Sequence, residues 1–93
     1  MDIQRVRTLT TGKMHTDIAD VYEDIYLLVG ESGIVTHMIP PAIRALRPFL
    51  LRRLPDPRFW NGEYDPTHVG DVPVAPLNAD ELTQFFLTFA LGR

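Results

Sequence analysis

The sequence predicts a mainly α fold of three or four short helices; an α+β fold with one short edge strand or strand pair is the alternative. In three stretches, apolar residues recur at the three- and four-residue spacing of an amphipathic helix. Helix-start signals precede two of these stretches, a Pro-Pro pair at 40–41 and a capping box at 78–81. With 93 residues, 45% hydrophobic and 23% charged, the chain suits a single small domain over residues 1–93.

The N-terminal segment fits either a helix or a strand. Ile3, Val6 and Leu9 share one face of a helix, and the run Thr10-Thr11-Gly12 would end that helix. The alternation of polar and apolar residues over 5–10 also suits a strand. A short helix is the interpretation we favour.

The clearest helical pattern runs from Asp17 to Val29. Thr16 or Asp17 is placed to cap the first free N–H groups, and the early acids suit the positive end of the helix dipole. Gly30 then supplies a left-handed stop. The apolar positions fall on one stripe, which consists of Ile18, Val21, Tyr22, Ile25, Leu28 and Val29.

A second helix is expected after a short connection over residues 31–38. Pro40-Pro41 begins it, because proline in the first turn loses only an N–H that would lack a partner anyway. Pro48 clashes with the preceding turn, so we expect a kink or a restart near Arg47. Leu54-Pro55 ends the helix.

Little regular structure is expected between residues 55 and 76, where five prolines and two glycines lie. The exception is Val72-Pro73-Val74, which predicts one edge strand, since a proline cannot donate to an inner ladder. We expect Phe59, Trp60 and Tyr64 to anchor this loop on the body of the domain.

The last helix has a clear start. Asn78 and Glu81 have the spacing of a capping box, and Leu77 is placed to pack on Leu82 as a hydrophobic staple. Its apolar stripe is too wide for a helix that is covered on one side only. We therefore expect it at the centre of the core or in contact with another chain. The candidates for self-association as a homodimer are Phe85, Phe86 and Phe89.

Charge alternates along the chain in a way that the net value of −3 conceals. Residues 1–13 carry +2, residues 14–38 carry −5, residues 39–60 carry +4, residues 61–92 carry −5, and Arg93 adds +1. Two explanations are open. The blocks pair with one another inside the fold and complement helix dipoles, or they form separate acidic and basic faces that steer a charged partner.

No arrangement in the sequence points to catalysis, a metal site or a cofactor. The chain has no cysteine, and Ser32, its only serine, lacks the G-x-S-x-G spacing of a nucleophile elbow. Asp20, Glu23 and Asp24 lie one turn apart as a cation site would require, but solvated acids on a helix are far commoner. The three histidines lack the spacing of metal ligands; they are His15, His37 and His68. We expect a non-enzymatic protein.

Membrane insertion and export are not expected either. No apolar run approaches the ~18 residues of a membrane span, and the first residues lack the apolar core of a signal peptide. The sequence therefore predicts a cytoplasmic location.

Binding is the better-supported use of the charged segments. Arginine and aromatic residues dominate binding hot spots, and the Arg44–Arg58 cluster lies next to Phe59 and Trp60. The same combination suits nucleic acid, but a nucleic-acid-binding domain is usually basic overall. We therefore favour a protein partner and keep nucleic acid as the alternative. The candidate partner-binding residues are Asp17, Asp20, Glu23, Asp24, Arg47, Arg52, Arg53, Arg58 and Trp60.

A longer pattern covers residues 8–55. It consists of Thr10-Thr11-Gly12, Val21-Tyr22-Glu23, Thr36-His37-Met38-Ile39-Pro40 and an Arg44-x-x-x-Pro48-x-Leu50-Leu51 run. This TTG…VYE…THxIP…RxxxPxLL pattern resembles a family of small uncharacterised proteins encoded by bacteriophages, prophages and related mobile elements. The segment Met38-Ile39-Pro40-Pro41 departs from it, since the family more often has a glutamine, a leucine and one proline there. No catalytic residue is carried over by the resemblance.

The resemblance implies a phage-type protein in the cytoplasm of a bacterial host. Small acidic phage proteins often inhibit or modulate host machinery, so we expect binding to a host protein complex, such as a CRISPR or other anti-phage defence complex. An acidic surface that imitates nucleic acid is one means, with residues 17–24, Glu63, Asp65 and Asp71 as candidates. The alternatives are a nucleic-acid-binding accessory protein and a self-associating structural or accessory phage protein.

Overall fold

A computed structural model describes residues 1–13, 17–31, 33–34, 36–63 and 65–91. Within these residues lie four α-helices: α1 (Ile3–Thr11), α2 (Ile18–Val29), α3 (Ile39–Arg53) and α4 (Ala79–Leu91). Two short 3-10 helices, η1 (Thr36–Met38) and η2 (Pro57–Phe59), accompany them. The prediction of a mainly α fold is confirmed.

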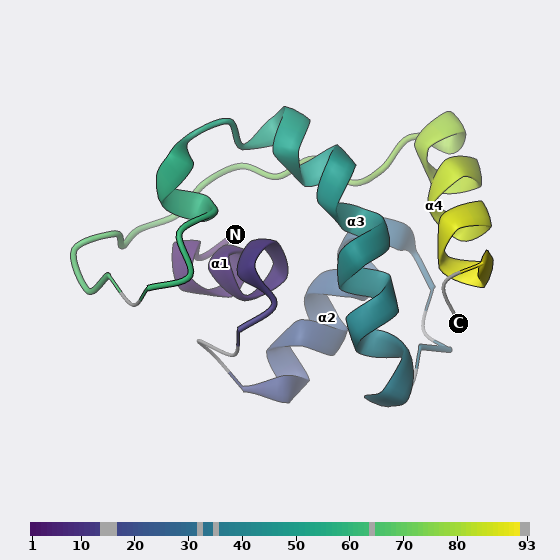
Figure 1. The fold of residues 1–93 in the computed structure, drawn as a ribbon, viewed down its shortest axis with the longest axis horizontal. Coiled ribbons are helices and arrows are strands. Elements are labelled where there is room, and N and C mark those ends of the chain that lie inside the picture. The colour runs from purple at the N-terminus through teal and green to yellow at the C-terminus, as the bar shows by residue number, and fades with distance from the viewer. Residues whose placement is uncertain (14–16, 32, 35, 64, 92–93) are drawn as a thin grey trace.

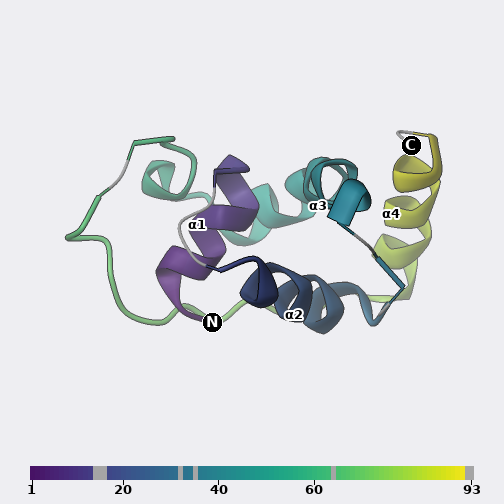
Figure 2. The same cartoon turned by 90° about the horizontal axis from the view of Figure 1, so that it is seen from below.

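Helix α3 lies at the centre of the fold. It contacts α1 on one side and α4 on the other, as Figure 1 and the turned view in Figure 2 both show. Because it is covered from several directions, α3 contributes more buried side chains than any other described helix. They are Ile39, Ala42, Ile43, Ala45, Leu46, Phe49 and Leu50.

Helix α1 confirms the helical interpretation of the N-terminal segment. The carboxylate of Asp2 accepts hydrogen bonds from the backbone N–H groups of Gln4 (3.0 Å) and Arg5 (3.2 Å), which caps the first turn. At the other end Gly12 has a φ of 73°, a left-handed conformation that favours glycine. Local sequence signals therefore set both ends of this helix.

Helix α2 begins one residue later than predicted and ends where predicted. Asp17 is its N-cap residue, but the Asp17 side chain makes no capping hydrogen bond. Thr16, the other predicted cap, lies outside the described residues. Gly30 has a φ of 70°, and its N–H donates to the carbonyl of Tyr26 at 2.7 Å, which closes the helix.

Helix α3 begins at Ile39, with both prolines of the predicted start signal in its first turn. It runs without interruption through Pro48, so the predicted restart near Arg47 does not occur. Pro48 is on the exposed side of the helix, whereas Leu46 and Phe49 on either side of it are buried. Packing on both sides of the proline outweighs the loss of one backbone hydrogen bond.

The predicted strand at residues 72–74 does not form, and this prediction is wrong. The only β feature of the described residues is an isolated antiparallel bridge between Asp2 and Asp71. Val72 still pairs with the chain start, because its N–H donates to the carbonyl of Met1 at 2.8 Å. Pairing stops there, since α1 begins at residue 3 and Pro73 has no N–H to extend a ladder.

Two of the three predicted aromatic anchors hold the proline-rich loop. The Phe59 ring is buried and meets the His68 ring edge-on, with the ring centroids 4.7 Å apart. The indole N–H of Trp60 donates to the carbonyl of Leu54 at 2.8 Å. Tyr64 lies outside the described residues.

Helix α4 starts with the predicted capping box. The Asn78 N–H donates to Oε1 of Glu81 at 3.0 Å, and the Glu81 N–H donates to Oδ1 of Asn78 at 2.9 Å. Leu77 is buried and Leu82 packs against the core. The helix lies at the edge of the molecule rather than at its centre (Figure 1), so the prediction of a central position is wrong.

Candidate functional site

One arginine from α1 faces most of the acidic segment of α2. Arg5 forms a bidentate pair with Asp24, with Nε–Oδ2 at 3.0 Å and NH2–Oδ1 at 2.7 Å. Its guanidinium also lies 3.6 Å from a carboxylate oxygen of Glu23 and 3.8 Å from one of Asp20. Burial raises the pKa of the Asp24 carboxyl above its ordinary value, although the hydrogen bonds from Arg5 act in the opposite direction.

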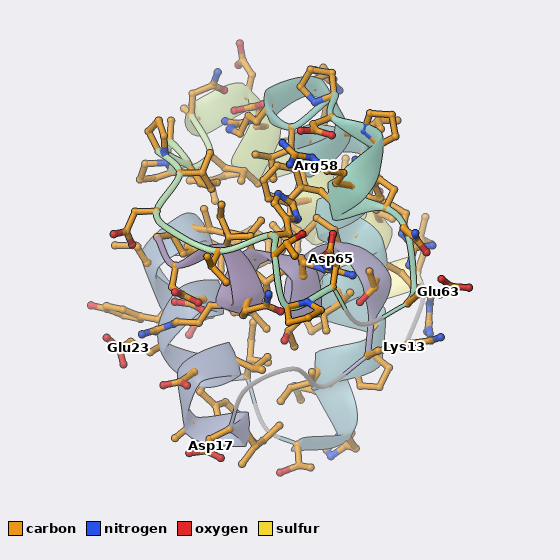
Figure 3. The ribbon with its side chains drawn as sticks, turned by 90° about the vertical axis from the view of Figure 1, so that its left-hand side faces the viewer. Lys13, Asp17, Glu23, Arg58, Glu63 and Asp65 are labelled. Carbon is orange, nitrogen blue, oxygen red and sulfur yellow. The ribbon has the colours of Figure 1, made fainter. Side chains whose placement is uncertain are left out.

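This arrangement changes the meaning of the predicted acidic site. Asp24 is only 3% exposed and is not available to a partner. Glu23 and Asp17 point outward from α2 in Figure 3. Asp17 is the one acid of the 17–24 segment that makes no ion pair within the described part of the chain. The guanidinium of Arg5 also takes the place that a divalent cation would need among these acids.

Arg53 connects α3 to the start of α4. Its NH2 and NH1 groups lie 2.6 Å and 2.8 Å from the two carboxylate oxygens of Glu81. Hydrogen bonds from Arg53 lower the pKa of Glu81 to about 2. The same guanidinium also donates to the backbone carbonyls of Ala75 (3.0 Å) and Pro76 (3.2 Å). Arg53 therefore holds the incoming chain of α4 and is not free for a partner.

The predicted cluster of arginine and aromatic residues is divided among internal contacts. Arg58 donates to Asp56 within one turn, with NH2–Oδ2 at 2.8 Å, and lowers the pKa of Asp56 to about 2. The Arg52 guanidinium carbon lies 5.3 Å from the centroid of the Phe49 ring, a cation–π contact on the same helix. Trp60 is half-buried with its indole N–H bonded to the backbone. These residues do not form one stacking platform for nucleic acid.

The main ion pairs thus join blocks of opposite charge. Arg5 of the first block pairs with Asp24 of the second, and Arg53 of the third pairs with Glu81 of the fourth. Of the two explanations for the alternating charge, pairing inside the fold accounts for these residues.

Two arginines are left over on α3. Arg44 and Arg47 are exposed, and neither makes an ion pair or a side-chain hydrogen bond within the residues that the structure describes. They border a hollow of about 430 Å³ between the start of α2 and the first half of α3. Ile18, which is 45% exposed, contributes to its apolar lining together with Ile43. An apolar recess beside two cations that the described residues leave unpaired is a surface that can recognise another molecule.

The three phenylalanines of α4 do not share one surface. Phe85 and Phe89 are buried, with their rings stacked at a centroid distance of 5.7 Å. Phe86 is 37% exposed, and the outermost apolar side chains are Leu87 and Leu91, which are 63% and 88% exposed. Of the predicted self-association residues, Phe85 and Phe89 are therefore not accessible to a second chain, and the exposed large apolar side chains of this helix are Phe86, Leu87 and Leu91.

Helix α1 carries a second set of polar contacts that sequence reasoning missed. Arg7 is only 1% exposed, and its NH2 group donates to the backbone carbonyls of Asn61 (3.0 Å) and Glu63. Gln4, one turn earlier, donates to the carbonyl of His68 at 2.8 Å. The acids Glu63 and Asp65 of the same loop, labelled in Figure 3, make no ion pair within the described part of the chain. Arg7 and Gln4 thus fix the loop through its backbone carbonyls.

Two further observations concern other kinds of site. Within the described ranges, no three side chains of histidine, aspartate or glutamate converge as metal ligands. His37 is exposed in η1, His68 is buried, and His15 lies outside the described residues. In the same part of the chain, no helix has both the length and the apolar character that crossing a bilayer demands.

The sequence identified Arg47 and the cluster that contains Arg44, but it did not identify the hollow. The sequence signal for the hollow was indirect. Ile39, Ile43 and Arg47 repeat at helical spacing and so share one face of a helix, but Ile18, which also lines the hollow, belongs to another helix. Only the packing of α2 beside α3 brings Ile18 to the arginines. No pattern within one helix predicts that contact.

Comparison with known proteins assigns the chain to a family without assigning it an activity. Residues 1–60 match a family described as a domain of unknown function, DUF7736. Neither a curated protein nor a solved structure matches the chain. The matched residues include α1, α2, α3 and η2, and they contain every described residue that lines the hollow beside Arg44 and Arg47. The chain therefore belongs to the DUF7736 family, whose match extends over its first three helices.

Proposed function

We propose that this protein is a non-enzymatic, phage-type binding protein. It acts in the cytoplasm of a bacterial host, where it attaches to a protein complex and inhibits or modulates it. A CRISPR complex or another anti-phage defence complex is the class of target that fits best. The phage setting rests on the resemblance of residues 8–55 to small phage and prophage proteins.

The observation that carries the binding function is the pair of arginines beside the apolar hollow, Arg44 and Arg47, which have no ion pair among the described residues. Most other strong charges of the described residues are held by internal partners, as in the Arg5–Asp24 and Arg53–Glu81 pairs. Arg44 and Arg47 are exposed next to apolar side chains, and this combination is typical of protein interfaces.

Imitation of nucleic acid by the acidic helix is less well supported. Of its four acids, Asp24 is buried against Arg5, and Asp20 and Glu23 lie within 4 Å of the same guanidinium. Their field is therefore partly cancelled before it reaches a partner. We accordingly place the partner on the α3 side of the molecule.

A pull-down from bacterial host lysate tests this proposal. Tagged protein is incubated with lysate, with and without nuclease, and the retained proteins are identified by mass spectrometry against a tag-only control. We expect one host complex to be retained in stoichiometric amounts in both arms. Retention of nothing above the control would refute the proposal, and retention that disappears with nuclease would support nucleic-acid binding instead.

Inhibition of a defence complex is tested in cells. A host that carries an active anti-phage system is infected with a targeted phage, with and without expression of the protein. We expect expression to raise the plating efficiency of the phage by at least about tenfold. An unchanged plating efficiency across hosts with different defence systems would contradict the inhibitory role while leaving binding open to the pull-down.

Self-association is a second candidate function, and the exposed leucines of α4 favour it. Leu87 and Leu91 lie one turn apart, and the described part of α4 carries no charged residue after Glu81. We expect any dimer to be dispersed by Leu87→Glu and retained by Leu27→Glu, since Leu27 is a similarly exposed helical leucine on α2. Light scattering measures the mass, and a monomeric wild type at high concentration would exclude this function.

A further inference from the structure

The hollow beside α3 has a floor and a rim of different chemistry. Its floor consists of Ile18 from α2 and of Ile39, Pro40 and Ile43 from the first half of α3. Its rim carries Arg44 and Arg47. We call these six residues the Ile–Arg groove. Its volume of about 430 Å³ lies within the range of sites that enclose a ligand or several side chains.

The charge of the groove is uncompensated. No described residue that lines the hollow is acidic, and the two arginines make no ion pair with described residues elsewhere. Arg44 and Arg47 lie three residues apart on one helix, so their guanidinium groups emerge on the same side. The complementary occupant carries carboxylates or phosphates at this rim.

The apolar floor decides between these two anions. A nucleic-acid backbone brings phosphates but no aliphatic side chains, so it would leave the accessible apolar side chains of the groove, Ile18 and Pro40, facing water. A protein segment brings both, with apolar anchors for the floor and carboxylates for the rim. The described residues of the groove include no strand edge, so the occupant is recognised through side chains rather than by strand addition.

We propose that the Ile–Arg groove binds an amphipathic helix of the partner protein, with apolar anchors flanked by glutamate or aspartate. This inference rests on the proposed binding function and names the chemistry of the partner at that site. Apolar side chains at positions i, i+3 and i+4 of the helix fill the floor, and carboxylates on its flank meet Arg44 and Arg47. The interaction is sensitive to salt because the rim is exposed.

Model peptides test the proposal directly. The probe is a fluorescent helical peptide of about 15 residues with leucine at i, i+3, i+4 and i+7 and glutamate on both flanks. A second peptide has lysine in place of every glutamate. Anisotropy titration of the full chain is expected to show binding of the glutamate peptide at least about tenfold tighter than that of the lysine peptide.

Charge exchange gives the decisive comparison. In the double variant Arg44→Glu/Arg47→Glu, we expect the preference between the two peptides to reverse, so that the lysine peptide binds more tightly than the glutamate peptide. Both positions are exposed, and circular dichroism verifies that the variant remains folded. If the variant keeps the preference for the glutamate peptide, or if the wild type shows no preference, the proposal is overturned.

The apolar floor has its own matched pair. Ile18→Ser removes an exposed side chain of the groove, and Leu27→Ser removes an equally accessible one from another part of α2. We expect only Ile18→Ser to weaken binding of the glutamate peptide, by about fivefold. Equal effects of the two substitutions would contradict a site at the groove.

The pull-down and the peptide titration together distinguish a failure of this inference from a failure of the proposed function. If the pull-down bait retains a host complex while the wild type binds no peptide at about millimolar concentration, the groove is not the site and the binding function stands. If the pull-down retains nothing, the function fails whatever the peptides do.

Discussion

Arg5 shows how a single residue decides the charge of a whole surface. It collects three carboxylates of α2 at distances of 2.7 to 3.8 Å, and one of them belongs to the buried Asp24. A buried carboxylate is tolerated because the guanidinium pairs with it. Removing the arginine leaves that charge without compensation.

We therefore expect Arg5→Met to lower the free energy of unfolding by about 2 kcal/mol at pH 7. Burial already raises the pKa of Asp24, and without Arg5 the pKa rises further. The folded state then holds a proton that the unfolded state has released, so stability is gained as the pH falls through the folded pKa. Urea denaturation at pH 7 and pH 5 measures the free energy of unfolding. We expect the deficit of Arg5→Met relative to the wild type to be smaller at pH 5 than at pH 7.

A second substitution serves as control. Asp24→Leu in the Arg5→Met background removes the unpaired carboxylate, so it restores stability and abolishes the extra pH dependence. An equal deficit at both pH values in the single variant would contradict the role of Asp24.

A sequence pattern alone predicts an exposed Arg7, because charged side chains usually lie in water. Here its guanidinium is buried and holds two backbone carbonyls of the loop, at Asn61 and Glu63. The Nε and NH1 groups of Arg7 have no hydrogen-bond partner in the described residues, so its hydrogen bonds to them are made by NH2 alone.

Substitution of Arg7 is expected to loosen the loop before it affects the helices. Arg7→Ala lowers the free energy of unfolding by about 2–3 kcal/mol, because it leaves the carbonyls unpaired and a cavity beside them. Hydrogen exchange measured by mass spectrometry localises the change to residues 59–70. A loss of protection confined to α4 would show that Arg7 does not hold this loop.

At the scale of elements, helix α4 depends on contacts at its first turn. Glu81 completes the capping box with Asn78 and pairs with Arg53 of α3. Further along the helix, Phe85 and Phe89 provide its buried anchors. The position of α4 thus rests on one charged residue and two rings.

We expect Glu81→Ala to lower the free energy of unfolding by about 1–2 kcal/mol. The pKa of Glu81 is lowered to about 2, so its contribution is present above the unfolded pKa of about 4.5 and is lost as the pH falls towards 2. Thermal unfolding of the wild type and Glu81→Ala at pH 7 and pH 2.5 measures the difference. Asp80→Ala, which removes an exposed acid of the same turn, is the matched control. A difference that persists unchanged at pH 2.5 would contradict the ion-pair contribution.

Helix boundaries were predictable from the sequence because their signals are local. The glycine at residue 30 and the capping box at 78–81 act within one turn, and both are found where the pattern predicted them. The strand at 72–74 was wrongly predicted because a strand depends on a distant partner, and only Met1 and Asp2 precede α1 to pair with it. Of the kink or restart predicted near Arg47, the restart does not occur, because packing from other elements holds α3 together across Pro48.

At the scale of the whole molecule, the pairing of the charge blocks and the formation of the Ile–Arg groove both follow from how the helices pack. The packing of α1 and α2 brings Arg5 to the acids, and the packing of α2 and α3 brings Ile18 to Arg44 and Arg47. The sequence shows the blocks but not which members pair, because pairing is a tertiary property. That is why most of the predicted acidic residues are paired with Arg5, whereas Arg44 and Arg47, which have no ion pair among the described residues, remain as the candidate site.

The most direct measurement of the central claim is the amount of host complex that the protein retains when the rim of the groove is reversed. Arg44→Glu/Arg47→Glu is compared with Arg52→Glu, an exposed arginine of the same helix outside the groove. We predict that the double variant, although folded, retains less than about a tenth of the complex bound by the wild type, while Arg52→Glu retains it all. Equal retention by the wild type and both variants would contradict the claim that this protein binds its partner through the Ile–Arg groove.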